Sequence, residues 1–171
     1  TAKALSTDLG EIGGDHLIIA TGAWTKPIAK SGNQNLPLET ERGYHIELVN
    51  PSAMPKSPMM VAAGKFVITP MEGRIRCAGI VEFGGLKAGP SKAPVELLKR
   101  QFTELMPNIT YDSVNEWMGH RPATPNSLPA IGTMGTYKNA YLGVGHQHLG
   151  LTGGPKTGRI LSGLISGATP N

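Results

Sequence analysis

The glycine-rich segment at residues 143–158 constrains this chain more than any other part of its sequence. It reads Gly-Val-Gly-His-Gln-His-Leu-Gly-Leu-Thr-Gly-Gly-Pro-Lys-Thr-Gly and joins the apolar run Ala140–Val144 to a helix predicted over residues 155–165. A junction of this kind directs several free backbone N–H groups at one point, under the positive end of the helix dipole. The pattern predicts a contact with an anion or an electron-rich carbonyl, with a plain tight turn as the alternative.

The segment is not the glycine fingerprint that binds a dinucleotide. That fingerprint has the form G-x-G-x-x-G, and the place of its third glycine after Gly143 and Gly145 is taken by His148. Neither this fingerprint nor a P-loop occurs in the 171 residues. If the protein binds a dinucleotide, the element that holds the pyrophosphate lies elsewhere.

The composition is that of a globular protein, because hydrophobic residues make up 39% of the chain and charged residues only 16%. The net charge is +4, but Lys and Arg are spread singly and do not alternate with aromatic residues, so no nucleic-acid partner is indicated. A small anionic ligand suits this charge better. The single cysteine, Cys77, excludes an internal disulfide and a zinc site built from cysteines. No apolar run is long enough for a membrane span.

The spacing of apolar residues predicts a mixed α/β fold. The predicted strands are residues 3–7, 15–21, 37–49, 66–70, 74–82, 112–121 and 140–144. The predicted helices are residues 24–30, 94–106 and 155–165. Strands of the buried, parallel type occur at both ends, and amphipathic strands with one helix lie between them. This arrangement predicts two interleaved structural units.

Five short motifs occur in the order found in a known family. They are Ala20-Thr-Gly-Ala-Trp24, Arg42-Gly43-Tyr44, Trp117-Met-Gly-His-Arg-Pro-Ala-Thr-Pro125, Leu128-Pro-Ala-Ile-Gly132 and Gly145-His146 through Gly158. Together they resemble the FAD-dependent D-amino-acid oxidase/dehydrogenase superfamily, which includes bacterial D-amino-acid dehydrogenase, glycine oxidase and sarcosine oxidase. The match runs from residue 15 to residue 167. Each motif alone is weak evidence, but five in order are strong.

The resemblance implies partial FAD-binding segments that flank an antiparallel-sheet substrate-binding domain. Residues 1–35 would end the FAD-binding domain, residues 36–125 would form the substrate-binding domain, and residues 126–171 would return to the FAD-binding domain. Family members carry G-x-G-x-x-G near their N-terminus, so we expect a C-terminal fragment that lacks this half and does not retain FAD. Localisation is expected to be cytoplasmic or peripheral to the inner membrane.

The implied activity is oxidation of the CH–NH bond of a D-amino acid, with hydride transfer to the flavin and an imine that hydrolyses to a 2-oxo acid. A sarcosine, glycine or D-hydroxyproline oxidoreductase on the same scaffold is the enzymatic alternative. An inactive substrate-domain module is the other alternative. The expected partners are a small amino-acid or amine substrate, the missing N-terminal half, and a second copy that protects exposed strand edges.

The resemblance also implies roles for individual residues. Arg121 would pair with the substrate carboxylate, for which a planar guanidinium is well shaped. His148 stands where some relatives have a basic, substrate-facing residue, although a structural histidine fits equally. The flavin ring would lie against a segment whose N–H groups stabilise negative charge. The residues of that segment are Gly145, His146, Gly150, Leu151 and Thr152.

Further candidates come from the middle of the chain and from its start. Gly22 and Ala23 follow a predicted strand where the family brings its chain close to FAD, and Arg42 and Gly43 resemble the segment that passes beside the flavin. Phe66 is assigned to the substrate pocket by a loose alignment, at a place where some relatives have tyrosine, and it fits the core as well. No metal site is predicted, because no third ligand has recognisable spacing with the two histidines of the glycine-rich segment.

Overall fold

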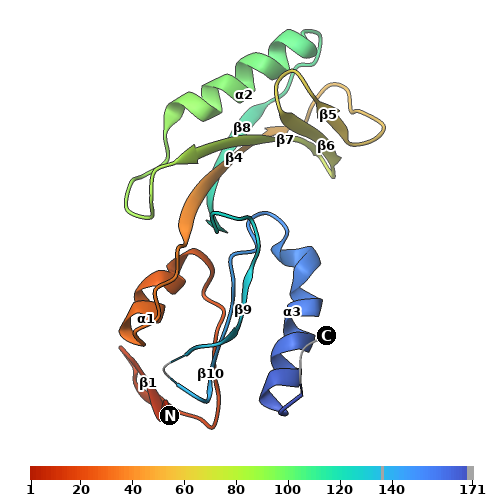
Figure 1. Cartoon of the computed structure of the whole chain (residues 1–171). Helices are drawn as coiled ribbons and strands as arrows, with labels where there is room; N and C mark the ends of the chain where they lie inside the picture. Colours follow the sequence, from red (N-terminus) through yellow and green to blue (C-terminus); the bar gives the residue numbers. More distant parts are fainter. Residues whose placement is uncertain (136, 169–171) are drawn as a thin grey trace. The chain divides into compact units, whose positions relative to one another are not determined.

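The computed structural model describes residues 1–135 and 137–168, and contacts within the chain divide it into two units. The first unit comprises Thr1–Thr40 and Arg121–Asn171, and the second comprises Glu41–His120. Figure 1 shows that the first unit contains both ends of the chain. The sequence placed the ends of the middle domain at residues 36 and 125. The roles assigned to the two parts remain predictions.

The first unit contains a three-stranded sheet, a hairpin and two α-helices. The hairpin pairs β1 (Ala4–Thr7) with β2 (Gly10–Gly13), and the sheet has the order β3-β10-β9. Strand β10 (Ala140–Val144) pairs parallel with β3 (Leu17–Ile19) and antiparallel with β9 (Ala130–Thr133). A short 3-10 helix, η1 (Gly22–Trp24), leads into α1 (Thr25–Ser31), and α3 (Gly150–Ile165) follows β10.

The centre of this sheet is β10, because a neighbouring strand pairs with each of its edges. Ala140, Leu142 and Val144 are nearly inaccessible to solvent, which accounts for the continuous apolar run in the sequence. The prediction that residues 15–21 form a strand buried on both faces is wrong. Only three of these residues form β3, an edge strand of the described sheet, and Ile18 is 48% exposed.

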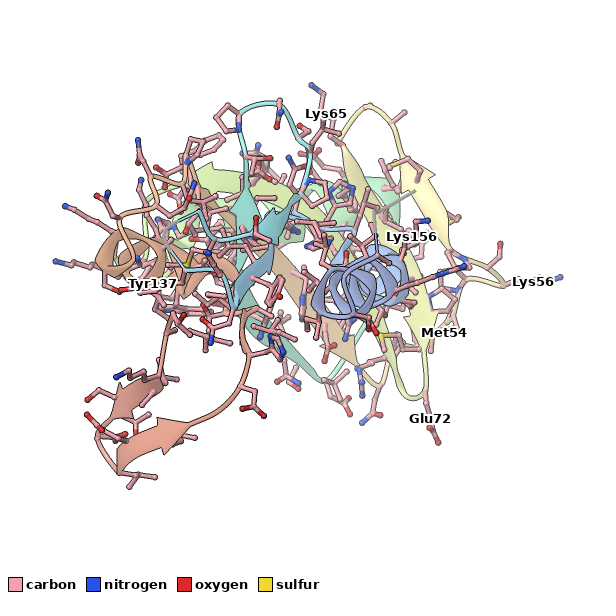
Figure 2. The ribbon with its side chains drawn as sticks, turned by 60° about the horizontal axis from the view of Figure 1, so that its bottom comes forward. Met54, Lys56, Lys65, Glu72, Tyr137 and Lys156 are labelled. Atoms are coloured by element: carbon pink, nitrogen blue, oxygen red, sulfur yellow. The ribbon has the colours of Figure 1, made fainter. Side chains whose placement is uncertain are left out.

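The second unit is a five-stranded sheet with one helix on it. The strand order is β5-β6-β7-β4-β8, and the pairs β5–β6, β6–β7 and β4–β7 are antiparallel. The strands are β4 (Glu39–Val49), β5 (Met59–Val61), β6 (Phe66–Met71), β7 (Arg74–Phe83) and β8 (Ser113–Ala123). Glu72 lies at the tip of the β6–β7 hairpin (Figure 2).

Helix α2 (Lys92–Leu105) covers one face of this sheet. Side chains alternate between the two faces of a strand, so every second residue of β4 and β7 faces the helix. The shared core contains Tyr44, Ile46, Leu48, Phe66, Ile68, Ile75, Cys77, Val95, Leu98 and Phe102. The opposite face carries the intervening residues, which are more polar.

A bulge interrupts the pairing of β4 with β7. Gly43 pairs with Val81 and His45 pairs with Ala78, so two residues of β7 lie opposite one residue of β4. One of the two is Gly79, where an added Cβ would lie 2.6 Å from the carbonyl oxygen of Lys65. Glycine is therefore required for β6 and β7 to approach each other here.

The mixed α/β class with antiparallel sheets is confirmed, but several element bounds differ from those predicted. Helix α3 begins at Gly150 and not at residue 155. Its first turn was not predicted, because the glycines in it have low helix propensity. Strand β8 continues to Ala123, two residues beyond its predicted end, and the short strands β2, β5 and β9 were not predicted. Among the described helices, none is long and apolar enough to cross a membrane.

Candidate functional site

The glycine-rich segment forms a tight turn between β10 and α3. Gly145 has φ +87°, and a Cβ there would lie 2.8 Å from Cγ2 of Thr124, so both conformation and space call for glycine. Gln147 also has a positive φ, of 52°, and its N–H donates to the carbonyl of Pro122 at 2.9 Å. The turn is therefore held against the end of β8.

A side-chain hydrogen bond ties this turn to the helix that follows. Nε2 of His146 lies 2.7 Å from Oγ1 of Thr157, and the same hydroxyl donates to the carbonyl of Gly153 at 3.0 Å. A hydroxyl has one proton to donate, so Nε2 of His146 carries the proton of the first bond. A Cβ on Gly153 would lie 3.3 Å from the imidazole, which leaves the ring little room to move.

The first turn of α3 leaves backbone donors available. Its N-cap is Leu149, no side chain forms a capping hydrogen bond, and the first turn has no acidic residue. The first N–H groups of a helix have no partner within the helix, and the helix dipole adds positive potential there. Gly150, Leu151 and Thr152 supply these groups, and the side chains of the last two are exposed. The arrangement suits an electron-rich ligand group.

Arg121 lies directly before the residue that holds the turn. Its side chain is half-buried, and it forms no ion pair with any carboxylate among residues 1–135 and 137–168. The bond from Gln147 to Pro122 places the end of β8 beside the turn within the first unit. The structure thus brings the segments of Arg121 and His148 together, and His148 itself is exposed.

Gly22 and Ala23 form η1 of the same unit. Gly22 has φ +56°, and a Cβ there would meet no atom within 4 Å, while Ala23 is buried. This left-handed conformation explains why a glycine stands at the start of η1, in the turn that follows β3. Contact of these residues with a cofactor remains a prediction.

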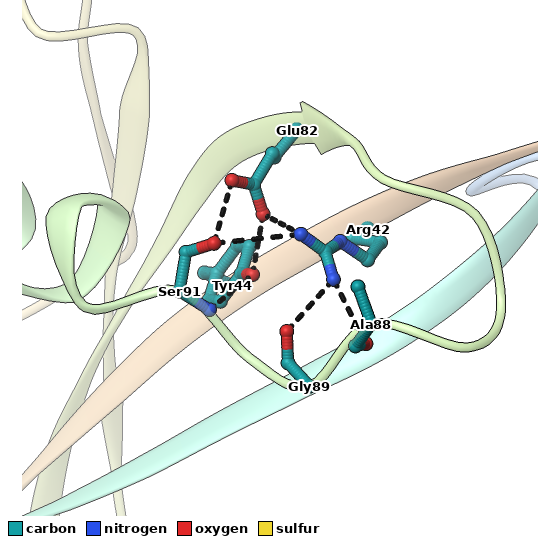
Figure 3. A network of polar contacts seen from close by, with 6 residues as sticks. All are labelled: Arg42, Tyr44, Glu82, Ala88, Gly89 and Ser91. Atoms are coloured by element: carbon teal, nitrogen blue, oxygen red, sulfur yellow. Dashed lines mark hydrogen bonds and ion pairs between the residues drawn. The ribbon is translucent and has the colours of Figure 1, made fainter.

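Arg42 is at the centre of a polar network in the second unit (Figure 3). Its guanidinium forms an ion pair with Glu82 and donates to the carbonyls of Ala88 at 2.9 Å and Gly89 at 2.8 Å. The side chain is only 4% exposed. The guanidinium therefore fixes the loop between β7 and α2. A flavin beside this segment would contact Gly43 and backbone atoms, and not the side chain of Arg42.

Tyr44 and Ser91 complete the network. The Tyr44 hydroxyl donates to Glu82 at 2.7 Å and accepts the N–H of Ser91 at 3.0 Å, and the Ser91 hydroxyl donates to Glu82 at 2.7 Å. These hydrogen bonds, from Tyr44 foremost and then Ser91 and Arg42, hold the pKa of the Glu82 carboxyl below its usual value. The start of α2 is thereby fixed to the sheet.

Phe66 and Cys77 lie in the core of the second unit, on the face covered by α2. Phe66 is 1% exposed and Cys77 is fully inaccessible. Burial raises the pKa of the Cys77 thiol to about 12, which keeps it protonated, as expected of a structural thiol. The assignment of Phe66 to a substrate pocket remains a prediction, and its side chain serves packing here.

Several residues of these sites carried no recognisable signal in the sequence. Thr157 is eleven residues from His146, and only the return of α3 past the turn brings them together. The stacked pair of His45 and Trp117 joins β4 to β8 over an even longer separation. No group of three His, Cys, Asp or Glu residues that could hold a metal occurs within the described part of the chain.

Fold and site together define an α/β protein with two features for ligand binding. Its turn and helix start suit an electron-rich ligand group, and Arg121 is available for an anion. The chain matches the family model described as FAD dependent oxidoreductase over residues 2–164. It belongs to this family of FAD-dependent oxidoreductases.

Curated relatives agree with this assignment. The chain is 37% identical to a D-amino-acid oxidase of Bradyrhizobium diazoefficiens, over 98% of the chain and 41% of the relative. It is 31% identical to a glycine oxidase of Pseudomonas aeruginosa, over 97% of the chain and 46% of the relative. The chain thus spans less than half the length of these relatives.

Solved structures show the same fold. The glycine oxidase of Geobacillus kaustophilus superposes with a TM-score of 0.84 at 20% sequence identity, over 97% of this chain and 45% of that one. The L-proline dehydrogenase of P. horikoshii superposes with a TM-score of 0.80 at 22% identity, over 98% of this chain and 47% of that one. At such identities the likeness concerns the fold.

Proposed function

We propose that this chain contributes to an FAD-dependent enzyme that oxidises the CH–NH bond of a D-amino acid, giving an imine that hydrolyses to a 2-oxo acid and ammonia. One observation carries the proposal. A half-buried arginine with no ion pair among the described residues lies at a strand end bonded to the turn before an uncapped helix. These features supply a carboxylate partner and an electrostatically positive helix start within one unit.

The helix start fits the electron-rich edge of a flavin ring. Its N–H groups, at Gly150, Leu151 and Thr152, have no capping side chain, and no acidic residue lies in the first turn to repel a ring that gains negative charge. Gly154 offers open space, since a Cβ there would meet no atom within 4 Å. Bound FAD would supply the acceptor for the two electrons of the oxidation.

Arg121 would hold the substrate by its α-carboxylate. A guanidinium binds a carboxylate through two parallel hydrogen bonds, which fixes both the position and the orientation of the substrate. Catalysis would then rest largely on positioning, because hydride transfer from the substrate to a flavin needs little acid–base machinery. His148, exposed in the neighbouring turn, would face the substrate as a second polar contact.

Retention of FAD by this chain is a separate question. No G-x-G-x-x-G fingerprint occurs in its sequence, so we propose that these 171 residues alone do not retain the cofactor. Purified chain that is colourless and takes up no added FAD supports this. A yellow preparation with flavin absorption bands contradicts it.

The test of the function replaces Arg121 in the complete polypeptide in which this chain occurs. In Arg121→Ala, kcat/KM for D-alanine should fall by about 30-fold to 5,000-fold, since the loss of one partner of a charge pair costs about 2–5 kcal/mol. Arg100→Ala is the matched control, because Arg100 is 68% exposed on α2. An unchanged kcat/KM in Arg121→Ala rejects the carboxylate role.

The choice of substrate separates this proposal from its nearest alternative. The glycine oxidase relative is 31% identical, so glycine and sarcosine must be compared with D-alanine on the same preparation. The proposal predicts the highest kcat/KM for D-alanine. A higher value for glycine or sarcosine would assign the enzyme to the alternative reaction on the same scaffold.

A further inference from the structure

Gln147 has a backbone conformation that glycine adopts far more readily. Its φ is +52°, in the left-handed region where a side chain crowds the backbone. The other non-glycine residues of the described chain with a positive φ have exposed side chains, and they are Asn33, Asn50, Lys65 and Ser127. Of these described residues, only Gln147 is half-buried. A side chain kept at a strained position next to a candidate site is evidence that the side chain has a use there.

The end of β8 holds the backbone of Gln147 in place. The N–H of Gln147 donates to the carbonyl of Pro122 at 2.9 Å, and both residues belong to the first unit. Arg121 is the residue before Pro122, so the same hydrogen bond brings the backbones of Arg121 and Gln147 close together. Both side chains are long, and they leave the backbone at neighbouring points. They can therefore reach the same small ligand.

The backbone hydrogen bond does not account for the side chain of Gln147, because a glycine would donate the same N–H. The side-chain amide forms no hydrogen bond with any residue among 1–135 and 137–168. Neither of its polar atoms is among the buried atoms of these residues that lack a partner, so the amide is open to a ligand. It offers a carbonyl oxygen that accepts hydrogen bonds and an NH2 group that donates them.

The groups assigned above to the substrate carboxylate and to the flavin edge are donors. The guanidinium of Arg121 has no acceptor atom, and the first turn of α3 presents backbone N–H groups. An amino acid carries its carboxylate and its amine on the same carbon, and the N–H groups of the amine need an acceptor. The amide oxygen of Gln147 is an open acceptor on a residue fixed beside Arg121.

We propose that the side-chain amide of Gln147 binds the α-amine of the substrate whose carboxylate pairs with Arg121. The inference rests on the proposed function and adds the residue that selects for the amine. An uncharged amide oxygen accepts an N–H of the amine but stabilises a positive charge less than a carboxylate does. Gln147 therefore holds the amine without favouring its protonated form. The neutral form is the one whose electron pair becomes part of the C=N bond of the imine.

Two ligands that differ only in the amine test this contact in the complete, FAD-loaded polypeptide. In Gln147→Met, which keeps the length of the side chain, kcat/KM for D-alanine should fall about tenfold, the loss of one hydrogen bond of about 1.4 kcal/mol. Competitive inhibition by propionate, which has the carboxylate but no amine, should be unchanged in this variant and weakened in Arg121→Ala. If Gln147→Met weakens D-alanine and propionate equally, the residue only supports the turn and the proposal is overturned.

The pH dependence of kcat gives a readout that a purely structural role would not change. In Gln147→Glu, the new carboxylate should stabilise the protonated amine of the bound substrate. KM for D-alanine should therefore fall, kcat at pH 7 should fall as well, and the pH at which kcat is half-maximal should rise. A kcat profile that is identical in the original polypeptide and in Gln147→Glu contradicts the proposal.

Stability separates a binding role from a folding role in the chain itself. Gln147→Gly removes the strain of the positive φ, so its midpoint of thermal unfolding should be at least as high as that of the original chain. The same change in the complete polypeptide should reduce kcat/KM for D-alanine as Gln147→Met does. A lower midpoint would mean that the fold needs the side chain, which overturns the proposal. Asn33→Gly is the matched control, because Asn33 has a φ of 55° and an exposed side chain, and its kinetics should not change.

Failure of this inference is distinguishable from failure of the proposed function. If kcat/KM for D-alanine falls in Arg121→Ala and is unchanged in Gln147→Met, Gln147 does not bind the amine, whereas the proposed function stands. If kcat/KM is unchanged in Arg121→Ala and falls in Gln147→Met with propionate inhibition intact, the amine contact stands and the carboxylate role of Arg121 is rejected.

Discussion

Nε2 of His146 lies 2.7 Å from the hydroxyl oxygen of Thr157, and this contact ties the turn after β10 to the body of α3. The turn carries His148 and is bonded to the strand end beside Arg121. The hydrogen bond therefore helps to hold the two halves of the candidate site in register, although neither of its residues needs to touch a ligand.

Thr157→Val should destabilise the first unit by about 1–3 kcal/mol, because it keeps the shape of the buried side chain but leaves the His146 donor without its acceptor. Urea unfolding measures the change. Thr157→Ser is the control, since it retains the hydroxyl. Equal stability of the valine and serine variants would show that the hydrogen bond contributes nothing.

Tyr44→Phe should destabilise the second unit by about 1–2 kcal/mol. The buried hydroxyl donates to Glu82 and accepts from the N–H of Ser91, and its removal leaves that N–H without this partner. Hydrogen exchange should show faster opening at the start of α2. Tyr111→Phe, outside this network, is the comparison, and identical exchange in the two variants would disprove the account.

Gly79→Ala should destabilise the second unit by about 1–3 kcal/mol, since its methyl group would lie 2.6 Å from backbone atoms of Lys65 and Phe66 that cannot move independently. Gly89→Ala is the matched control, because a Cβ there meets no atom within 4 Å. Thermal unfolding of the two variants decides the point. Similar midpoints would mean that the bulge tolerates a side chain.

Stability of the second unit should fall as the pH is lowered from 7 to 5.5. The pKa of His45 is lowered from 6.5 by burial and by Arg76, so the unfolded chain takes up the proton first. The stabilisation is fully present above pH 6.5 and is lost as the pH falls toward the pKa of the folded state. Unfolding followed by tryptophan fluorescence in a Trp24→Phe background, where Trp117 is the emitter, should show a flatter pH profile in His45→Gln. Stability profiles that fall equally with pH in the original chain and in His45→Gln would contradict His45 as the cause.

The strands and helices with strong apolar periodicity were predictable from the sequence. The β6–β7 hairpin and α2 are amphipathic and bounded by turn residues, so the pattern locates them within a few residues. The first turn of α3 was not predictable, because glycine disfavours helix and because Thr157, whose hydroxyl donates to the carbonyl of Gly153, lies one turn further along the helix.

The candidate site was predictable only in part. Glycines with required conformations, such as Gly145, leave a signal in the sequence. The pairing of Thr157 with His146, the commitment of Arg42 to Glu82, and the stack of Trp117 on His45 depend on how distant segments meet. No local pattern encodes such contacts.

Anaerobic mixing of the complete, FAD-loaded polypeptide with single amino acids tests the central claim most directly. D-alanine should bleach the flavin absorption within the time of turnover, and L-alanine at the same concentration should leave it unchanged. Flavin that is bound but is bleached by no D-amino acid would contradict the account.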